Sequence, residues 1–470
     1  EQETMVLGAL ASRPAMVLWT LLGLALLWQV KRLVDYTWWR PRRLQRALRA
    51  QGLRGTPYRF PVGDLGDYGR QGKEASSRAL PLRCHDIRAH VAPYLCSTVR
   101  EHGKTCVSWF GPVPKVTIAD PGVTREVMSN KFGHFEKLQF PTLTRLLAGG
   151  VAVYEGEKWV KHRRILNPAF HVEKLKNFQL MMPAFSACCE ELVSRWIESL
   201  GSDGCCEVDV CPEFQTLTGD VISRTAFGSS YLEGRRIFEL QSVQADRIVA
   251  EVKKIFIPGY MSLPTKKNRL MHQTNNEIES ILRGLIEKRM QAMQQGESTK
   301  DDLLGLMLES NMRETDDKGQ PILGMTIEEV TMILYEVLRL YPPAVAFMRK
   351  TYKEIEIGSI TYPAGVIIEL PVLLIHHDPD IWGSDVHEFK PERFADGIAK
   401  ASKDPGAFLP FGWGPRICIG QNFALLEAKM ALCMILQHFE FELGPTYSHV
   451  PHNQKMLRPM HGAQIKLRAI

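Results

Sequence analysis

The sequence lacks the cysteine spacing that would point to a zinc protein. Its ten cysteines occur as the adjacent pairs Cys188-Cys189 and Cys205-Cys206 and as scattered single residues. Such spacing is not that of a zinc site. Ten cysteines could form disulfide bonds if the protein were secreted, but the simpler expectation is that they are free thiols in a reducing cytosol. The sequence also lacks internal repeats and low-complexity tracts.

Charge of one sign is in excess in only one short segment. The net charge is +6, and residues 31–54 contain eight basic residues but one acidic residue, Asp35. The remaining chain is close to neutral. A broad basic face for nucleic acid is therefore not expected. With 45% hydrophobic and 23% charged residues, the composition is ordinary for a globular chain with one large core or two domains.

Uncharged residues form one long run, 14–30, which is rich in Leu, Ala and Trp and is followed by Lys31-Arg32. Its length is near the lower limit for a membrane helix, about 17 to 25 residues. A cleaved signal peptide is an alternative, but no small-x-small site follows the run; a buried core helix is another. The basic flank predicts residues 1–13 in the lumen, an anchor at 14–30, a basic juxtamembrane linker at 31–60 and a cytosolic globular domain at 61–470.

The pattern of apolar residues predicts a mainly helical chain with small peripheral sheets. Helical periodicity dominates residues 172–310, and glycine-rich breaks occur at 201–204 and 296–301. A hairpin around Gly111-Pro112 and a short helix from Pro121 precede this region. The expected strands are 107–110, 116–119, 354–357, 366–370, 439–443 and 465–470.

A ten-residue segment near the C-terminus surrounds one cysteine with glycine, arginine and aromatic residues. Residues 411–420 read Phe-Gly-Trp-Gly-Pro-Arg-Ile-Cys-Ile-Gly, and helix-forming residues 421–438 follow directly. An isolated cysteine is usually a small buried apolar residue. Here the start of a helix supplies amide donors and a positive dipole end, which stabilise a thiolate at Cys418. Gly414 and Gly420 allow backbone amides to approach the sulfur.

This segment resembles the signature F-x-x-G-x-R-x-C-x-G of the cytochrome P450 family of haem-thiolate monooxygenases, and it matches at every fixed position from Phe411 to Gly420. The resemblance implies the cytochrome P450 fold and haem b (iron protoporphyrin IX), with Cys418 as the axial iron ligand. Thiolate ligation favours cleavage of the oxygen–oxygen bond. It also implies that Phe411 packs beside the macrocycle and that Arg416 pairs with a haem propionate.

Two further motifs fit the same family. Glu336 and Arg339 are three residues apart on a predicted helix, where an ordinary surface ion pair would be the default interpretation. The stop at Pro342-Pro343 and the later segment with Arg393 resemble the family pattern. The resemblance implies that Glu336, Arg339 and Arg393 form a structural ion triad that fixes the segment before Cys418.

Trp159 and Arg163 lie four residues apart, so they share one face of a predicted helix. The resemblance implies that they bind a haem propionate. The alternative is a half-buried tryptophan beside surface basic residues. Nearby Lys158, Lys161 and Arg164 then form either a patch that steers an acidic reductase or a solvated charged face.

The oxygen-activating signature of the family, A-G-x-[DE]-T-[TS], is not found in the sequence. Residues 325–330 resemble the start of that central helix, but residues 331–334 already resemble the later helix of Glu336. The two join at Val330 and Thr331, so on the order of fifty or more residues, with most of a distal helix rising about 1.5 Å per residue, are expected to be absent. No catalytic acid or alcohol can be assigned. An aberrant transcript or gene model is the expected cause.

The leading hypothesis is a haem-thiolate monooxygenase that inserts one oxygen atom from O2 into a lipophilic small molecule, with NADPH electrons supplied by a reductase. The resemblance extends to the plant membrane-bound group that includes secologanin synthase, which implies a terpenoid-like substrate, an endoplasmic reticulum membrane location and a monomer. Substrate-facing segments are expected at 132–150, 252–263, 344–348 and 455–459. The alternatives are a haem-thiolate isomerase or lyase acting on oxygenated lipids and a non-catalytic membrane-bound remnant.

Overall fold

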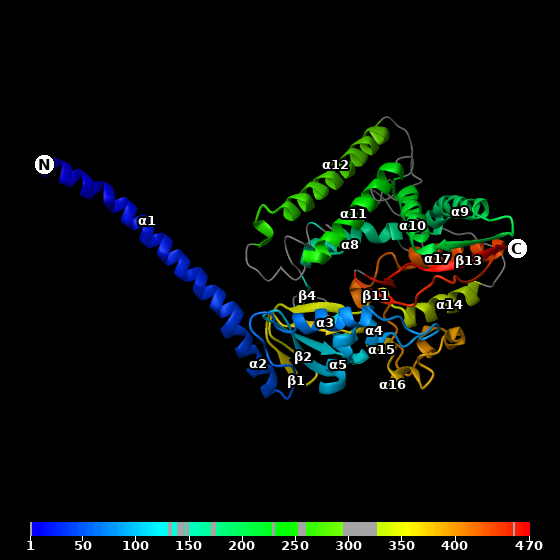
Figure 1. The fold of residues 1–470 in the computed structure, drawn as a ribbon, viewed down its shortest axis with the longest axis horizontal. Coiled ribbons are helices and arrows are strands. Elements are labelled where there is room, and N and C mark those ends of the chain that lie inside the picture. The colour runs from blue at the N-terminus through cyan, green and yellow to red at the C-terminus, as the bar shows by residue number, and fades with distance from the viewer. Residues whose placement is uncertain are drawn as a thin grey trace.

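The structure is a computed structural model that describes residues 2–129, 134–138, 146, 150–170, 175–227, 231–251, 260–294, 327–454 and 456–470. Within these ranges helices predominate, and small β-sheets lie at their edges (Figure 1). The predicted mainly helical architecture is therefore confirmed. The helices are α1 (Gln2–Val34), α2 (Arg40–Ala50), α3 (Leu65–Ser76), α4 (Arg88–Val91), α5 (Pro93–His102), α6 (Pro121–Ser129), α8 (Gly156–Phe170), α9 (Leu175–Glu198), α10 (Val210–Phe227), α11 (Tyr231–Glu251), α12 (Lys266–Gln294), α14 (Ile327–Leu340), α15 (Val372–His376), α16 (Pro379–Trp382) and α17 (Gln421–His438).

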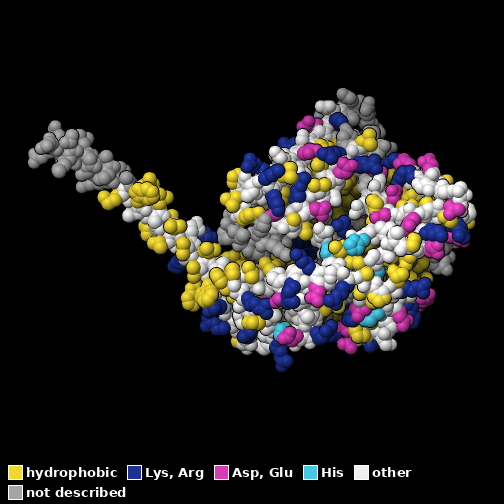
Figure 2. All heavy atoms as spheres, in the orientation of Figure 1, with side chains coloured by type: hydrophobic (Ala, Val, Ile, Leu, Met, Phe, Trp, Pro, Cys, Tyr) yellow, Lys and Arg dark blue, Asp and Glu magenta, His cyan; other side chains and the backbone are white. Residues whose placement is uncertain are grey.

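The N-terminal helix stands away from the rest of the molecule. Its apolar side chains from Met16 onward are exposed, including Trp19 at 72% and Leu27 at 67% (Figures 1 and 2). Among the described residues, one helical segment, Met16–Ala50, is long and apolar enough to cross a membrane. An apolar helix without protein cover requires an apolar environment, so α1 fits a membrane anchor.

The basic segment that follows is helical rather than extended. A π-helical stretch, Asp35–Trp39, joins α1 to α2. The end of α2 is fixed to the body, because the Gln51 side-chain amide donates to the carbonyl oxygen of Thr361 at 2.7 Å and accepts from its backbone N–H at 2.5 Å. Leu48 is fully buried. Residues 31–50 of the segment predicted as a linker (31–60) thus form a continuous helix, and the C-terminal end of this helix is attached to the body.

The largest sheet has the strand order β1-β2-β3-β9-β6-β4. The predicted hairpin is confirmed, with Val107 paired to Val116. Lys115 on β3 donates to Glu369 on β9 at 2.8 Å, and both side chains are buried. The strands of this largest sheet are β1 (Arg54–Gly55), β2 (Thr105–Phe110), β3 (Val113–Ile118), β4 (Phe135–Lys137), β6 (Phe347–Thr351) and β9 (Ile367–Leu370).

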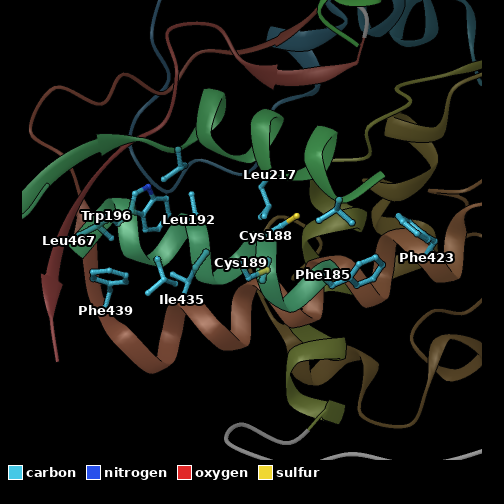
Figure 3. Packing of buried hydrophobic residues seen from close by; sticks show 14 residues of the cluster. Phe185, Cys188, Cys189, Leu192, Trp196, Leu217, Phe423, Ile435, Phe439 and Leu467 are labelled. Carbon is cyan, nitrogen blue, oxygen red and sulfur yellow. The ribbon is translucent and has the colours of Figure 1, made fainter. Parts of the chain in front are cut away.

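A second core lies between α9, α10 and α17 (Figure 3). Cys188 and Cys189 are buried there as free thiols, and burial raises their pKa values to about 11 and about 12. The adjacent pair is therefore part of the hydrophobic packing. The labelled members of the cluster are Phe185, Cys188, Cys189, Leu192, Trp196, Leu217, Phe423, Ile435, Phe439 and Leu467.

The other sheets are small and show where the sequence prediction was wrong. Residues 205–209 were predicted to be within a helical region, but they form β5, which pairs with β13 more than 250 residues later. Pairing with a distant strand overrides the local pattern. The strands β1, β4, β6, β8, β11 and β12 were also not predicted. The strands of these sheets are β5 (Cys205–Asp209), β10 (Phe439–Leu443), β13 (Gln464–Ala469), β7 (Ile355–Ile357), β8 (Ile360–Tyr362), β11 (Pro451–Asn453) and β12 (Leu457–Pro459).

Candidate functional site

The loop with Cys418 is closed by a backbone hydrogen bond and followed by α17. The Cys418 N–H donates to the carbonyl oxygen of Phe411 at 2.9 Å, and Gly420 caps the helix. Gly414 has a φ of +69°, and a Cβ there would lie 2.9 Å from the carbonyl oxygen of Met128. Its glycine is therefore required by both conformation and space. Gly420 has a φ of −89° and no described atom near the position of a Cβ, so sterics give no comparable reason for glycine there.

Helix α8 brings the predicted tryptophan–arginine pair to this loop. Arg163 donates from Nη1 to the carbonyl oxygen of Ile417 at 2.9 Å, directly beside Cys418. The guanidinium of Arg416 lies 4.3 Å from the ring centroid of Trp159. Arg416 also forms an ion pair with Glu155 and donates to the carbonyl oxygen of Tyr154 at 3.0 Å. Residues more than 250 positions apart in the sequence thus form one cluster around the cysteine.

Two further basic residues of this cluster were not predicted from the sequence. Arg349 on β6 is buried, and the structure gives its guanidinium two partners among the described residues, the carbonyl oxygen of Met348 and the sulfur of Met128. Burial, together with the charge of Arg416, lowers the pKa of Arg349 to about 10. Lys137 on β4 donates to the carbonyl oxygen of Ala152, and burial lowers its pKa to about 8. Both pKa values fall because burial disfavours the charged forms and the neighbouring charge of Arg416 repels them.

The basic cluster, defined as Lys137, Arg163, Arg349 and Arg416, thus holds more positive charge than the described residues balance. Glu155 is the one carboxylate that acts on it among them. Arg349 is buried and the other three are half-buried, and cations that are removed from water require anionic partners. A ligand with two carboxylates and a metal that accepts a thiolate would satisfy both the cluster and Cys418. Haem, with its two propionates, fits the residues that are present.

The predicted ion pair behind the loop is completely buried. Glu336 and Arg339 are both 0% exposed, and Arg339 donates to the two carboxylate oxygens at 2.8 and 2.7 Å. Arg339 also donates to the carbonyl oxygens of His376 at 3.0 Å and Val386 at 2.8 Å. This pair therefore holds backbone groups from α15 and from the segment before the Cys418 loop.

Arg393 is less closely tied to Glu336 than the sequence suggested. Its Nε lies 3.6 Å from Glu336 Oε1, whereas its Nη1 donates to Asp385 Oδ1 at 3.0 Å. Asp385 was not predicted as a member of this group. Hydrogen bonds from Lys390 and Arg393 lower the pKa of Asp385 to about 2. The group is therefore a network with two carboxylates and two guanidinium groups.

A second group of metal-ligating side chains lies elsewhere in the described residues, and an arginine side chain already contacts it. Ligand atoms of Asp86, His377 and His387 lie within 4.8 Å of one another. Arg88 donates to both oxygens of Asp86, at 2.8 and 2.9 Å, and lies 3.0 Å from Nε2 of His387. The guanidinium thus provides the positive charge at this place. The basic cluster around Cys418 remains the candidate cofactor site, and it is typical of proteins that hold haem through a thiolate.

Comparisons with known proteins agree with this class. The family model for cytochrome P450 matches residues 82–334 and 325–467. The chain is 47% identical to cytochrome P450 CYP72A616 of Paris polyphylla, with all of both chains covered. It is 45% identical to cytochrome P450 72A15 of Arabidopsis thaliana over 93% of this chain and 96% of that one. The chain belongs to the cytochrome P450 family, within the plant CYP72A group.

A solved structure shows the same fold. The structure of retinoic acid bound cyanobacterial CYP120A1 is similar to this chain with a TM-score of 0.64 and 19% identity, and it covers 88% of this chain and 100% of that one. As a member of the family, the chain is a haem-containing monooxygenase enzyme with a lipophilic substrate and a redox partner that passes on electrons from NADPH.

Two features of the alignments concern residues 325–334. The two matches to the family model overlap there instead of forming one continuous match. The alignment with the Paris polyphylla relative extends over 528 positions, whereas the chain has 470 residues, so at least 58 positions hold no residue of this chain. In the structure, α14 runs without interruption through Val330 and Thr331.

Proposed function

We propose that this chain is a haem-thiolate monooxygenase of lipophilic, terpenoid-like molecules, with Cys418 as the iron ligand, and that it lacks the oxygen-activating part of the family's central helix. The observation that carries the haem assignment is the gathering of one buried and three half-buried cationic side chains beside Cys418, with Glu155 as the one carboxylate among the described residues that acts on them. When bound, haem supplies the iron at which O2 is activated. The basic cluster neutralises the two propionates, and the buried Glu336–Arg339 pair keeps the loop in place.

The proposed deletion at Val330/Thr331 is supported by the divided family match and by the length of the alignment. The lost residues would include the acid and the alcohol of the family signature, which would supply protons for oxygen activation. General acid catalysis typically contributes about 10² to 10⁴ in rate. Loss of the distal wall would also admit water to the haem. We therefore expect haem binding without efficient substrate oxidation.

We further propose that α1 anchors the protein in the endoplasmic reticulum membrane, with the catalytic body in the cytosol. The basic residues 31–54 directly after the apolar run support this orientation, since basic segments stay on the cytosolic side. Electrons would come from a membrane-bound NADPH-dependent reductase. The chain itself would act as a monomer. Of the expected substrate-facing segments, 132–150 and 252–263 lie largely outside the described residues, whereas 344–348 is described throughout.

The experiment that tests the proposal is the carbon monoxide difference spectrum of the reduced full-length chain, compared with Cys418→Ser. We expect the long-wavelength Soret band of a thiolate complex in the wild type and its complete loss in the variant. A haem-free wild-type chain would favour the non-catalytic remnant instead. If haem binds and a hydroperoxide is consumed without NADPH, the isomerase or lyase hypothesis would replace the monooxygenase.

Substitution of Arg349 tests the role of the basic cluster. We expect Arg349→Leu to weaken haem binding about 10- to 100-fold, because a charge-assisted hydrogen bond contributes roughly 1.5–3 kcal/mol. Titration of the haem-free chain with haem, followed by absorbance, measures this change. Lys350→Leu is the matched control, since Lys350 is the next residue on β6 and is exposed. Equal affinities of the two variants would contradict a contact between Arg349 and a propionate.

A further inference from the structure

The last residue of α15, His376, is a fully buried histidine with both ring nitrogens paired to backbone groups. Nδ1 lies 3.2 Å from the carbonyl oxygen of Arg339, so this nitrogen must carry the proton and donate it. Nε2 accepts a hydrogen bond from the backbone N–H of Leu409 at 2.8 Å. The two contacts together determine a single neutral tautomer.

These contacts place the imidazole between the ion-pair helix and the cysteine loop. Arg339 lies on α14 and binds Glu336 through its side chain, while its own carbonyl oxygen receives the His376 proton. Leu409 lies two residues before Phe411, whose carbonyl oxygen accepts the N–H of Cys418 at 2.9 Å. One side chain therefore connects α14 with the start of the loop that ends at Cys418.

Aromatic neighbours fix the orientation of the ring. His376 stacks on Phe408 with a centroid distance of 5.6 Å and an interplanar angle of 16°, and it forms a T-shaped pair with Trp382 at a centroid distance of 6.2 Å. Burial lowers the pKa of His376 to about 3, so the ring remains neutral at physiological pH. The two hydrogen bonds and the stacking together fix the orientation of the imidazole ring.

We propose that His376 is a positioning residue that holds the Cys418 loop in register with α14. The functional part of this inference rests on the proposed role of Cys418 as iron ligand. The contact between Nε2 and Leu409 is the one that acts on the loop, because the remainder of the path from Leu409 to Cys418 is backbone.

His377 provides a matched control. It is also fully buried, burial lowers its pKa to about 3 as well, and its Nε2 donates to the carbonyl oxygen of Leu340 at 2.9 Å. Its Nδ1 faces Nδ1 of His387 at 3.4 Å. None of these contacts reaches the Cys418 loop, so loss of His377 removes equal burial and a similar backbone contact without acting on the loop.

Amide hydrogen exchange of the full-length chain in detergent tests the inference with and without haem. His376→Asn keeps a donor near Arg339 but cannot reach Leu409, so the peptide that carries Leu409 should exchange about tenfold faster or more. His376→Gln should restore much of the protection, since its longer side chain can present an acceptor near the position of Nε2. His377→Asn should leave exchange of this peptide unchanged.

In haem-loaded protein, His376→Asn should increase the share of the reduced carbon monoxide complex without the thiolate band several-fold over His377→Asn. Equal exchange in the Leu409 peptide for these two variants would overturn the inference, as would a uniform rise of exchange in all peptides of both His376 variants. If the wild type takes up no haem, the proposed function fails, but the exchange measurements still decide whether His376 holds the loop.

Discussion

Glu336→Gln is expected to lower the free energy of unfolding by about 3–5 kcal/mol, because a buried guanidinium then loses its charged partner. Arg339 is 0% exposed and takes both oxygens of this carboxylate, and the backbone N–H of Lys390 donates to it as well at 3.1 Å. Arg393 lies 3.6 Å away. The substitution therefore leaves Arg339 without its charged partner, whereas Arg393 keeps its pair with Asp385.

Urea denaturation of the full-length chain in detergent, followed by circular dichroism and tryptophan fluorescence, measures this loss. Glu74→Gln is the control: Glu74 lies in the last turn of α3 and pairs with Arg78 just beyond the helix, and the two side chains are 58% and 76% exposed. Such a surface pair contributes less than about 0.5 kcal/mol. A loss below about 1 kcal/mol for Glu336→Gln would contradict the assignment of a buried, interdependent pair.

Insertion of the corresponding segment of the Paris polyphylla relative between Val330 and Thr331 is expected to raise substrate oxidation by at least about 100-fold. The segment would restore the protonating groups and the wall above the haem. Product formation per NADPH consumed, measured with a plant reductase, gives both the rate and the coupling. This is the largest change in activity that we expect from any alteration of the chain.

A matched insertion separates the two contributions of that segment. The same residues with the acid and alcohol of the family signature replaced by alanine should restore the enclosed pocket, but should leave oxygen consumption poorly coupled to product. If the chain without any insertion oxidises substrate as fast as the chain with it, the proposed deletion does not explain its chemistry. The comparison requires equal haem content in all three proteins.

The parts of the molecule with strong local patterns were predictable from sequence. The helix 421–438 has the predicted bounds, since its residues are strong helix formers directly after a glycine. The hairpin around Gly111-Pro112 also follows from local turn residues. Trp159 and Arg163 could be placed on one helical face because four residues make about one turn. Their meeting with Arg416 required the family resemblance.

The missed residues depend on contacts that no local pattern contains. Arg349 alternates inward on β6, but only the fold shows that it faces the Cys418 loop. Lys137 lies on a strand of three residues. Asp385 lies in a segment whose sequence is typical of a surface loop, yet its carboxylate accepts a hydrogen bond from the guanidinium of Arg393. The distant pairing of β5 with β13 is similar, because a strand at a sheet edge is specified by its partner.

The attachment of α2 to the body determines how the enzyme can move on a bilayer. Gln51 makes two hydrogen bonds to Thr361, and the hydroxyl of Tyr58 donates to the carbonyl oxygen of Thr37 at 2.5 Å. A helix fixed in this way cannot pivot freely against the body, so the two move together. Tilting of the helix in the lipid then swings the whole sheet. With α1 in the bilayer, the thickness of the membrane would then affect this tilt and so the height of the body above the lipid.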